Sequence, residues 1–213
     1  GFSVIAKDGS VIGSQGPPKL GVSWDGANDT TPLNIAQGQG PTAAGQVALS
    51  PDGALAVFVL GPASGRAGEI VPSALYAVAA EGGAPRQLSP AGVADRQPRW
   101  SPDGRTIGYV VDGLALWGLG AGSGARRLLY TLGGSSYLRL NGPRYSPDGR
   151  ALAFTDGCCG SYAIERINGD GSGLRRLLGG EVSVFQDWSP DGRWIAFSSD
   201  RDTRPPAFPG SWE

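Results

Sequence analysis

One short phrase occurs four times in the chain, and it limits the fold more than any other feature of the sequence. The tetrad Ser-Pro-Asp-Gly begins at Ser50, Ser101, Ser146 and Ser189, so the repeats follow one another at spacings of 51, 45 and 43 residues. A period of roughly 40 to 50 residues is typical of proteins built from repeated structural units. We therefore expect four equivalent turns, one in each unit of a repeat architecture.

Each residue of the tetrad suits a tight turn between two strands. The Ser hydroxyl can bond back to the backbone, Pro presets its own dihedral angle, Asp tolerates the bridge conformation and Gly can adopt a positive φ. After the fourth tetrad, Ile195 and Phe197 alternate with smaller residues, which is typical of a strand with a buried face. The small residues predict packing on the second face as well. The structural turn residues of these hairpin corners are Asp52, Asp103, Asp148 and Asp191.

A second hairpin follows each of the first three corners. Its two strands are predicted at residues 74–78 and 86–88, at 114–117 and 126–129, and at 162–167 and 174–178. Four short strands in about 45 residues are the anatomy of a β-propeller blade. Arginines gather on the last strand of each repeat, where charge discourages aggregation through an exposed edge. We therefore predict an all-β propeller of four-stranded antiparallel blades.

Composition favours a folded protein without catalytic machinery. A chain of 213 residues can bury about 70% of its unfolded surface. Histidine is absent, which removes the commonest general base and the commonest nitrogen ligand of metals, and no Gly-x-Ser-x-Gly elbow occurs. The net charge of −1 argues against nucleic acid as a partner. We expect no catalytic residue, no cofactor and no metal.

The two ends of the chain determine how a ring of blades would close. Residues 186–199 supply only the first hairpin of the last blade, and the Pro-rich stretch after it cannot be an internal strand. Residues 2–15 have the pattern of a hairpin, and we expect it to pair with the last blade and close the ring. With residues 20–45 as a reduced blade, formed by a weak hairpin and a loop over 37–45, the count is five blades. It is six if the chain is a fragment.

Membrane association is expected to be indirect. The longest apolar run, residues 54–60, is far shorter than the ~20 residues of a membrane helix. No Met occurs, so Gly1 is either a processed end or the start of a fragment. Contact with a membrane would then come through partners or through an anchor removed with a leader. We divide the chain into a single propeller domain, 1–199, and a Pro-rich tail, 200–213.

The repeated residues resemble a known family. The phrase Trp-Ser-Pro-Asp-Gly-Arg-x-Ile-Ala-Phe at the fourth corner, together with the Asn-x-Asp-Gly-Ser-Gly turn and Arg-Arg-Leu-Leu of the third repeat, is similar to the WD40-like (PD40) β-propeller repeat of TolB-type proteins. The resemblance covers residues 46–199. It implies a periplasmic or extracellular protein that binds other proteins. The same repeat occurs in propellers attached to prolyl-oligopeptidase-like and tricorn-like peptidases, so the repeat alone does not fix the function.

Two motifs resemble reactive or metal-binding sites. Cys158 and Cys159 are adjacent and flanked by glycines, so they are either two free thiols or a strained vicinal disulfide in an oxidising compartment. Redox catalysis is disfavoured because there is no Cys-x-x-Cys motif. Residues 168–173 look like the opening of a calcium loop, but Gly179 stands where such a loop needs Glu, which favours a hairpin turn.

Aromatic side chains and loops are the candidate partner-binding features. Most tryptophans lie at repeat positions, so we expect them to pack between blades. Phe208 and Trp212 lie in the Pro-rich tail, where an aromatic beside extended backbone can dock on a partner, and Tyr162 is a further candidate. The loops at 61–72 and 157–161 are expected to form the rest of the contact surface.

The sequence supports one leading interpretation and two alternatives. The first is a non-catalytic propeller that binds other proteins or scaffolds an assembly outside the cytoplasm. The second is the propeller portion of a prolyl-oligopeptidase-like peptidase, which a continuation of the gene carrying Gly-x-Ser-x-Gly and a late His would favour. The third is a carbohydrate-binding propeller.

Overall fold

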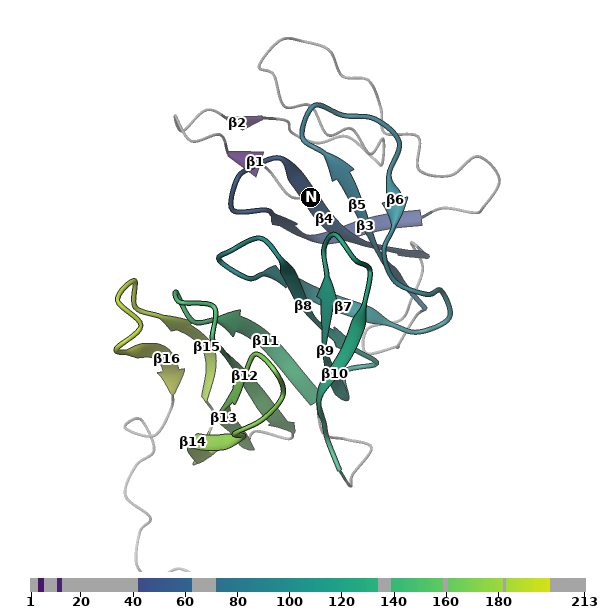
Figure 1. Cartoon of the computed structure of the whole chain (residues 1–213). Helices are drawn as coiled ribbons and strands as arrows, with labels where there is room; N and C mark the ends of the chain where they lie inside the picture. Colours follow the sequence, from purple (N-terminus) through teal and green to yellow (C-terminus); the bar gives the residue numbers. More distant parts are fainter. Residues whose placement is uncertain are drawn as a thin grey trace, which may run out of the picture. The chain divides into compact units, whose positions relative to one another are not determined.

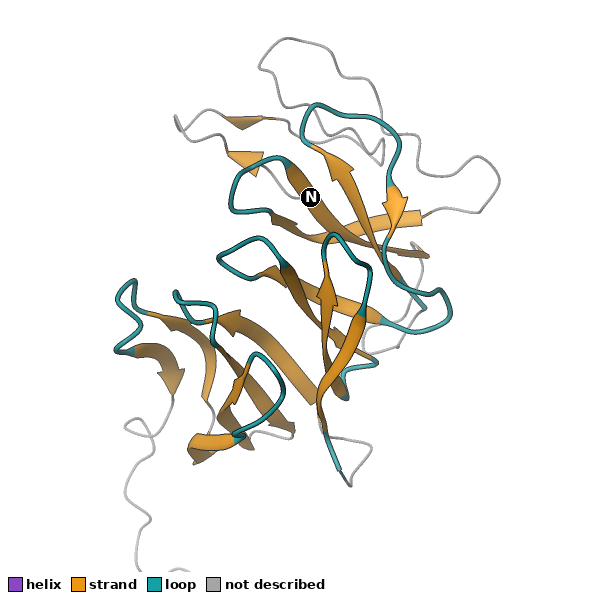
Figure 2. Cartoon of the chain, viewed as in Figure 1, coloured by secondary structure: helices purple, strands orange, loops and turns teal. Residues whose placement is uncertain are grey.

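All the regular secondary structure in the part of the chain that the structure describes is β-strand. The computed structural model describes residues 4–5, 11–12, 42–62, 72–133, 139–158, 161–181 and 183–199, and Figure 2 shows strands and loops along these ranges. No helix long and apolar enough to cross a membrane is found among them. The predicted all-β class is confirmed. The chain divides into two compact units, residues 1–100 and 101–213, which are described separately.

The first unit contains one complete four-stranded sheet and a short hairpin (Figure 1). The sheet is antiparallel, and its order is β3 (Thr42–Leu49), β4 (Leu55–Pro62), β5 (Ala74–Ala79), β6 (Arg86–Gln87). The short hairpin pairs β1 (Val4–Ile5) with β2 (Val11–Ile12). Strand β7 (Asp95–Trp100) ends the unit. The hairpin expected over residues 2–15 is thus present in its described residues, whereas the weak hairpin at 20–36 lies outside them.

Two loop boundaries predicted for the first repeat are wrong. Strand β3 begins at Thr42, inside the predicted loop 37–45, and β4 runs on to Pro62, inside the predicted loop 61–72. The reason is that Thr42 pairs with Pro62 and Ala43 with Gly61, so the two strands extend each other. Glycine and proline are turn signals in a sequence, but backbone pairing holds them in the sheet here.

One buried cluster of the first unit lies on one face of its four-stranded sheet, and Val57 and Leu75 on the other face are fully buried as well. Ala56, Phe58, Leu60 and Val78 form a buried cluster. The Phe58 ring stacks on Tyr76 with 6.1 Å between ring centroids. Because Phe58 and Tyr76 are cross-strand partners on β4 and β5, the second hairpin of the repeat is held to the first by aromatic packing.

The second unit continues the repeats (Figure 1). Three strands follow the second corner and pair antiparallel in succession: β8 (Thr106–Val111), β9 (Ala115–Gly120) and β10 (Arg126–Thr131). The third repeat is a complete sheet of β11 (Arg139–Tyr145), β12 (Ala151–Cys158), β13 (Ser161–Asn168) and β14 (Arg175–Glu181). The fourth has β15 (Ser183–Trp188) paired with β16 (Ile195–Ser199).

The third sheet is packed on both faces, as the alternation of large and small residues predicts. Every residue of β12 from Ala151 to Gly157 is buried. One core cluster joins the second repeat to the third, and its buried members are Val110, Leu116, Leu129, Leu140, Leu152, Phe154 and Ile167. Tyr130 on β10 packs on Phe154 with 5.3 Å between ring centroids. Consecutive repeats of this unit are therefore face-to-face sheets that share one core.

A residue with a positive φ precedes the corner in each of the first three repeats, and a β-bulge accompanies it in the first and the third. The residue four places before the corner Ser has a positive φ, which is 54° at Gln46, 54° at Gln97 and 61° at Gly142. The pairing register of β3 with β4 and of β11 with β12 shifts at this position. In the second unit, Gln186 Nε2 donates to the carbonyl oxygen of Gly142 at 2.6 Å. The positive φ is a regular feature of these three repeats, and a glutamine of the next repeat bonds to the bulge of the third.

The predictions that concern the whole ring stay predictions. They are the number of blades, closure of the ring by residues 2–15, and the boundary between a domain at 1–199 and a tail. Residues 200–213 lie outside the described part of the chain.

Candidate functional site

The four corners share one hydrogen-bonding pattern. At the third corner, Ser146 Oγ donates to Asp148 Oδ1 at 2.6 Å, and the same oxygen accepts the Arg150 N–H at 3.0 Å. Ser146 Oγ accepts the Ala151 N–H at 3.0 Å. The corresponding bonds occur at the first, second and fourth corners. The structure thus places Asp52, Asp103, Asp148 and Asp191 inside their own turns.

The same bonds fix the charge of the corner carboxylates. A hydrogen bond from the Ser hydroxyl, and next a bond from the backbone N–H two residues ahead, lower the pKa of each of the four aspartates. A carboxylate that accepts such bonds is stabilised in its ionised form. The corners therefore present fixed negative charges, and each is committed to its turn through one oxygen, Oδ1.

Consecutive corners of the second unit lie side by side. Pro102 Cδ lies 3.5 Å from the position that a Cβ on Gly149 would take, and Pro147 Cδ lies 3.5 Å from the corresponding position on Gly192. Both glycines have a positive φ, 71° and 69°. The proline of one corner therefore lies beside the glycine of the next, and the spacing between corners is repeated.

The tryptophan before the corner Ser also joins consecutive repeats. Trp188 Nε1 donates to the carbonyl oxygen of Arg144 at 3.1 Å, which lies two residues before the third corner. Within the first unit, Trp100 Nε1 makes the equivalent bond to Ala48 at 3.1 Å. Packing between repeats was expected for these residues, but the indole bond was not. Its signal in the sequence is that Trp precedes Ser at the second and fourth corners.

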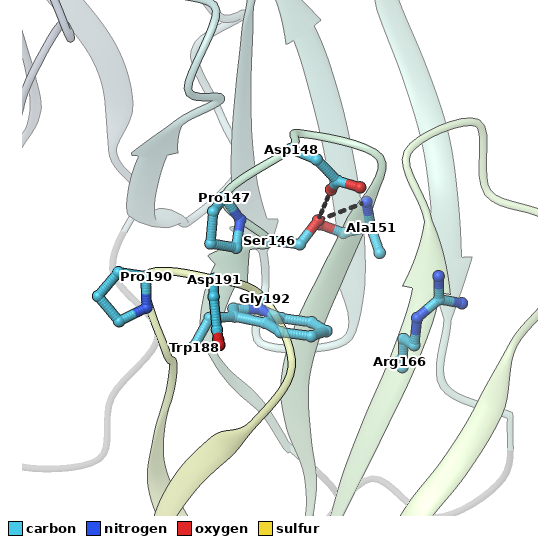
Figure 3. Close-up of a pocket in the computed structure, with 9 residues that line it drawn as sticks. All are labelled: Ser146, Pro147, Asp148, Ala151, Arg166, Trp188, Pro190, Asp191 and Gly192. Atoms are coloured by element: carbon cyan, nitrogen blue, oxygen red, sulfur yellow. Dashed lines mark hydrogen bonds between the residues drawn. The ribbon is translucent and has the colours of Figure 1, made fainter.

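The third and fourth corners enclose a groove of about 440 Å³. Its walls are residues 146–148 and 190–192, and Ala151, Arg166 and Trp188 complete it. Figure 3 shows the Trp188 ring lying between the two corners, with the Asp148 carboxylate above it and Arg166 beyond the ring on the side away from the prolines. Arg166 Nη1 donates to Asn168 Oδ1 at 3.1 Å, which fixes the guanidinium.

The groove offers binding chemistry. Its functional groups are two carboxylates, one guanidinium and one aromatic ring. Its Ser146 hydroxyl already donates to Asp148 and accepts from the backbone, so it is a turn residue. In the part of the chain that the structure describes, no group of three or more His, Cys, Asp or Glu is placed to hold a metal ion.

The other candidate residues do not line the groove. Tyr162 is half-buried on β13 opposite Gly157, and Cys158 is half-buried at the end of β12 opposite Ser161. This end of the β12–β13 hairpin is the one farthest along both strands from the third corner. Cys159, Phe208 and Trp212 lie outside the described residues, so the state of the cysteine pair and the role of the tail stay predictions.

The segment that resembles a calcium loop forms a hairpin turn. Asp170 Oδ1 accepts both the backbone N–H of Ser172 at 2.9 Å and its hydroxyl at 2.7 Å. Asn168 Nδ2 donates to Ser172 Oγ at 3.0 Å. The oxygen ligands that a cation would need are thus engaged within the turn.

A polar cluster that the sequence did not reveal lies between β10 and the third sheet. Asp156 and Glu165 are buried, at 8% and 4% exposed. Arg176, whose side chain is 63% exposed, bonds Glu165 Oε1 through Nε at 2.6 Å and places Nη2 3.9 Å from Asp156 Oδ1. Burial raises the pKa of Asp156, against the opposing effects of Arg176 and of a hydrogen bond with Tyr130. Burial, and next the charges of Asp156 and Glu165, raise the pKa of Tyr130.

Two curated proteins and one solved structure resemble the chain over most of its length. The chain is 32% identical over 184 residues to the uncharacterized protein Atu1656 of Agrobacterium fabrum, which covers 81% of this chain and 57% of that protein. It is 30% identical over 154 residues to the uncharacterized peptidase YuxL of Bacillus subtilis, and the match covers 71% of this chain and 21% of that peptidase. A structure from Agrobacterium tumefaciens assigned to TolB matches with a TM-score of 0.57 and 28% identity, covering 81% and 60%. No family model matches.

Solved structures of lower identity share the fold alone. An oligogalacturonate lyase matches with a TM-score of 0.60 at 13% identity, over 76% of this chain and 48% of that one. The β-propeller domain of the trilobed protease from Pyrococcus furiosus matches with a TM-score of 0.51 at 14% identity, over 70% of this chain and 46% of that one. The predicted β-propeller fold is confirmed. The chain spans 57% of the first curated relative and 60% of the TolB structure.

Proposed function

Because this chain is a TolB-like β-propeller repeat protein, we propose that it is a non-catalytic subunit that binds other proteins in an assembly outside the cytoplasm or at a membrane. The observation that carries the proposal is the groove between the third and fourth corners. It combines an aromatic ring with fixed charges of both signs, and its serine hydroxyl is committed to a turn. Such a surface suits recognition of a partner.

The location follows from the same resemblance. TolB-type propellers resemble this chain through the repeated phrase, and that resemblance implies a periplasmic or extracellular protein. An oxidising compartment would also suit the adjacent Cys158 and Cys159. We propose this compartment for the chain and protein subunits as its partners.

A closed ring is part of the proposal. The fourth sheet has two described strands, and Phe197 on β16 is 42% exposed. The residues at the same distance from the other corners, Phe58, Tyr109 and Phe154, are at most 3% exposed. The fourth sheet therefore has an apolar residue that further strands would cover. The hairpin β1–β2 supplies two strands, which supports closure by residues 2–15 and a count of five blades.

A pull-down with a matched pair of variants tests the protein-binding function. The bait is the full chain, incubated with detergent-solubilised envelope of the source organism, and captured proteins are identified by mass spectrometry. Arg166→Glu reverses a charge inside the groove, while Arg105→Glu reverses an exposed charge after the second corner, outside the groove. We expect a protein retained by the wild type and by Arg105→Glu but lost with Arg166→Glu. Equal capture by all three baits, or no capture, would refute the proposal.

The peptidase relative supports a second candidate function. The chain is 30% identical to a stretch that makes up 21% of the Bacillus subtilis peptidase. In that case the propeller would be the non-catalytic portion of a longer peptidase. Sequencing the gene beyond this segment decides the matter, because a downstream Gly-x-Ser-x-Gly with a late His would identify the peptidase.

A further inference from the structure

We propose that the groove between the third and fourth corners binds an arginine or lysine side chain carried on an extended segment of a protein partner. The inference rests on the protein-binding function proposed above and specifies the chemistry that the partner presents. It is carried by two carboxylates, one aromatic ring and one fixed guanidinium that line the same groove.

The two carboxylates are prepared to receive a cation. The turn bonds of Asp148 and Asp191 end on Oδ1, so the second carboxylate oxygen, Oδ2, takes no part in them. Both residues are exposed. Because these bonds hold the carboxylate in place, a ligand does not have to order it on binding. The same bonds favour ionisation, so the negative charge persists under mildly acidic conditions.

The tryptophan supplies an apolar surface between the charges. The indole N–H of Trp188 is already bonded to the Arg144 carbonyl oxygen, so the ring contributes its face and edge to the groove (Figure 3). A guanidinium or ammonium stacked on a tryptophan face is attracted by the ring electrons. The aliphatic part of an Arg or Lys side chain would also cover this ring.

Arg166 makes the two ends of the groove differ in charge. Its guanidinium is held by Asn168 beyond the Trp188 ring, so positive charge lies at one end and the carboxylates lie nearer the corners. A partner cation would therefore lie toward the corners, with a backbone carbonyl or an acidic residue beside it accepting from Arg166. A neutral sugar would also stack on Trp188, but it would gain less from two ionised carboxylates than a cation does.

Nuclear magnetic resonance on the full ¹⁵N-labelled chain tests the inference. The probe is the peptide acetyl-Ser-Gly-Arg-Gly-Ser-amide, and its control replaces arginine by citrulline, which has the same shape without the charge. The signals to follow are the Trp188 indole N–H and the backbone amides of Gly149 and Gly192. We expect saturable shifts with the arginine peptide and at least ~fivefold weaker binding of the citrulline peptide, as the loss of a cation–π contact and an ion pair implies.

Two matched variants separate groove chemistry from turn stability. Asp191→Asn keeps the Oδ1 acceptor of the fourth corner but removes its charge, and Asp103→Asn makes the same change at the second corner, outside the groove. We expect about threefold or greater weakening with Asp191→Asn and no change with Asp103→Asn. Equal binding of the two peptides, or equal weakening by the two variants, would overturn the inference.

Binding of a neutral sugar is the competing outcome. If cellobiose shifts the same three signals and the arginine peptide does not, the groove is a carbohydrate site and the inference is wrong. If neither probe binds but Arg166→Glu still abolishes capture of a partner in the pull-down, the protein-binding function stands and only the proposed ligand chemistry fails.

Discussion

The ring of Tyr145 fills the space that a side chain at Gly108 would occupy. A Cβ on Gly108 would lie 3.2 Å from Tyr145 Cε2, 3.3 Å from its hydroxyl oxygen and 3.0 Å from Leu152 Cδ2. Tyr145 stands where the second and fourth corners have tryptophan, and Gly108 stands where the third and fourth repeats have alanine. The two departures from the repeat therefore compensate each other: the aromatic ring enters the second repeat because the side chain there is missing.

Replacing Gly108 by alanine is expected to destabilise the protein by about 1–3 kcal/mol, the usual effect of an extra methyl group in a packed core. Urea denaturation measures the change. Gly118→Ala is the matched control. Gly118 lies on the neighbouring strand of the same sheet, and a Cβ there would meet only ordinary contacts, at 3.5 Å or more. We expect that variant to be neutral or slightly stabilising, since glycine weakens a strand interior. A loss of stability as large as that of Gly108→Ala would contradict the packing argument.

Ser146→Ala is expected to raise the pKa of Asp148 toward its ordinary value, because the Ser146 hydroxyl is the largest cause of its lowering. A carboxyl with a lowered pKa contributes stability above its unfolded-state pKa and loses it as pH falls through the folded-state pKa. The variant should therefore lose less stability than the wild type on strong acidification. Carbon-detected titration of the Asp148 carboxyl measures the shift, and the pKa of Asp191 should not change.

The same substitution removes the acceptor of the Ala151 N–H in a buried position, for which we expect a cost of about 1–2 kcal/mol. Ser189→Ala breaks the equivalent bond to Trp194, which is exposed. Its cost should be smaller, because water can replace the lost acceptor. Equal costs at the two corners would show that burial does not control the strength of this bond.

The corners could be predicted because their chemistry is local. Ser, Pro, Asp and Gly each act within a turn of a few residues, so the tetrad and its period were enough to place the hairpins and the four-stranded sheets. The groove depends on longer distances. Arg166 reaches it because β13 pairs with β12 in the register that sets Arg166 opposite Ala153. No local pattern reveals that pairing, so Arg166 did not stand out in the sequence.

The buried polar cluster shows the same limit. Glu165 lies on β13 opposite Phe154, and its partner Arg176 is on the next strand. The sequence predicts that an arginine on the last strand of a repeat protects an exposed edge, and the Arg176 side chain is 63% exposed. Its second role, pairing with buried carboxylates, depends on which face of the sheet each residue occupies.

Trp188→Phe is expected to destabilise the contact between the third and fourth repeats. Phenylalanine keeps an aromatic ring but removes the indole N–H, which leaves the carbonyl oxygen of Arg144 without this donor. We expect a loss of about 1 kcal/mol or slightly more. Compared with the wild type, the variant should show a larger increase in the exchange rate of amides in β15 and β16 than of amides in β12. If denaturation is unchanged and exchange does not increase in β15 and β16, the indole bond does not hold these repeats together.

Stability is expected to fall with rising pH through the ionisation of Asp156. Burial raises its pKa above the ordinary value of 3.8, so the folded state binds the proton more tightly than the unfolded state. This group therefore favours folding most below pH 3.8, and that contribution is lost as pH rises through the raised pKa. The charged groups facing it are Glu165 and Arg176, whose exposure limits its compensating effect, and the neutral Tyr130 hydroxyl bonds to it.

Asp156→Asn tests this sign. Asparagine cannot ionise, and its Oδ1 can still accept a hydrogen bond from Tyr130, so the variant resembles the protonated wild type. We expect the free energy of unfolding of the variant to increase relative to that of the wild type as the pH rises from 4 to 7. Urea denaturation at several pH values measures this difference. Asp148→Asn should change in the opposite direction and at lower pH, below about pH 4, because the pKa of Asp148 is lowered from its ordinary value of 3.8. A difference between Asp156→Asn and the wild type that does not depend on pH would mean that Arg176 and Tyr130 fully offset the burial of the carboxylate.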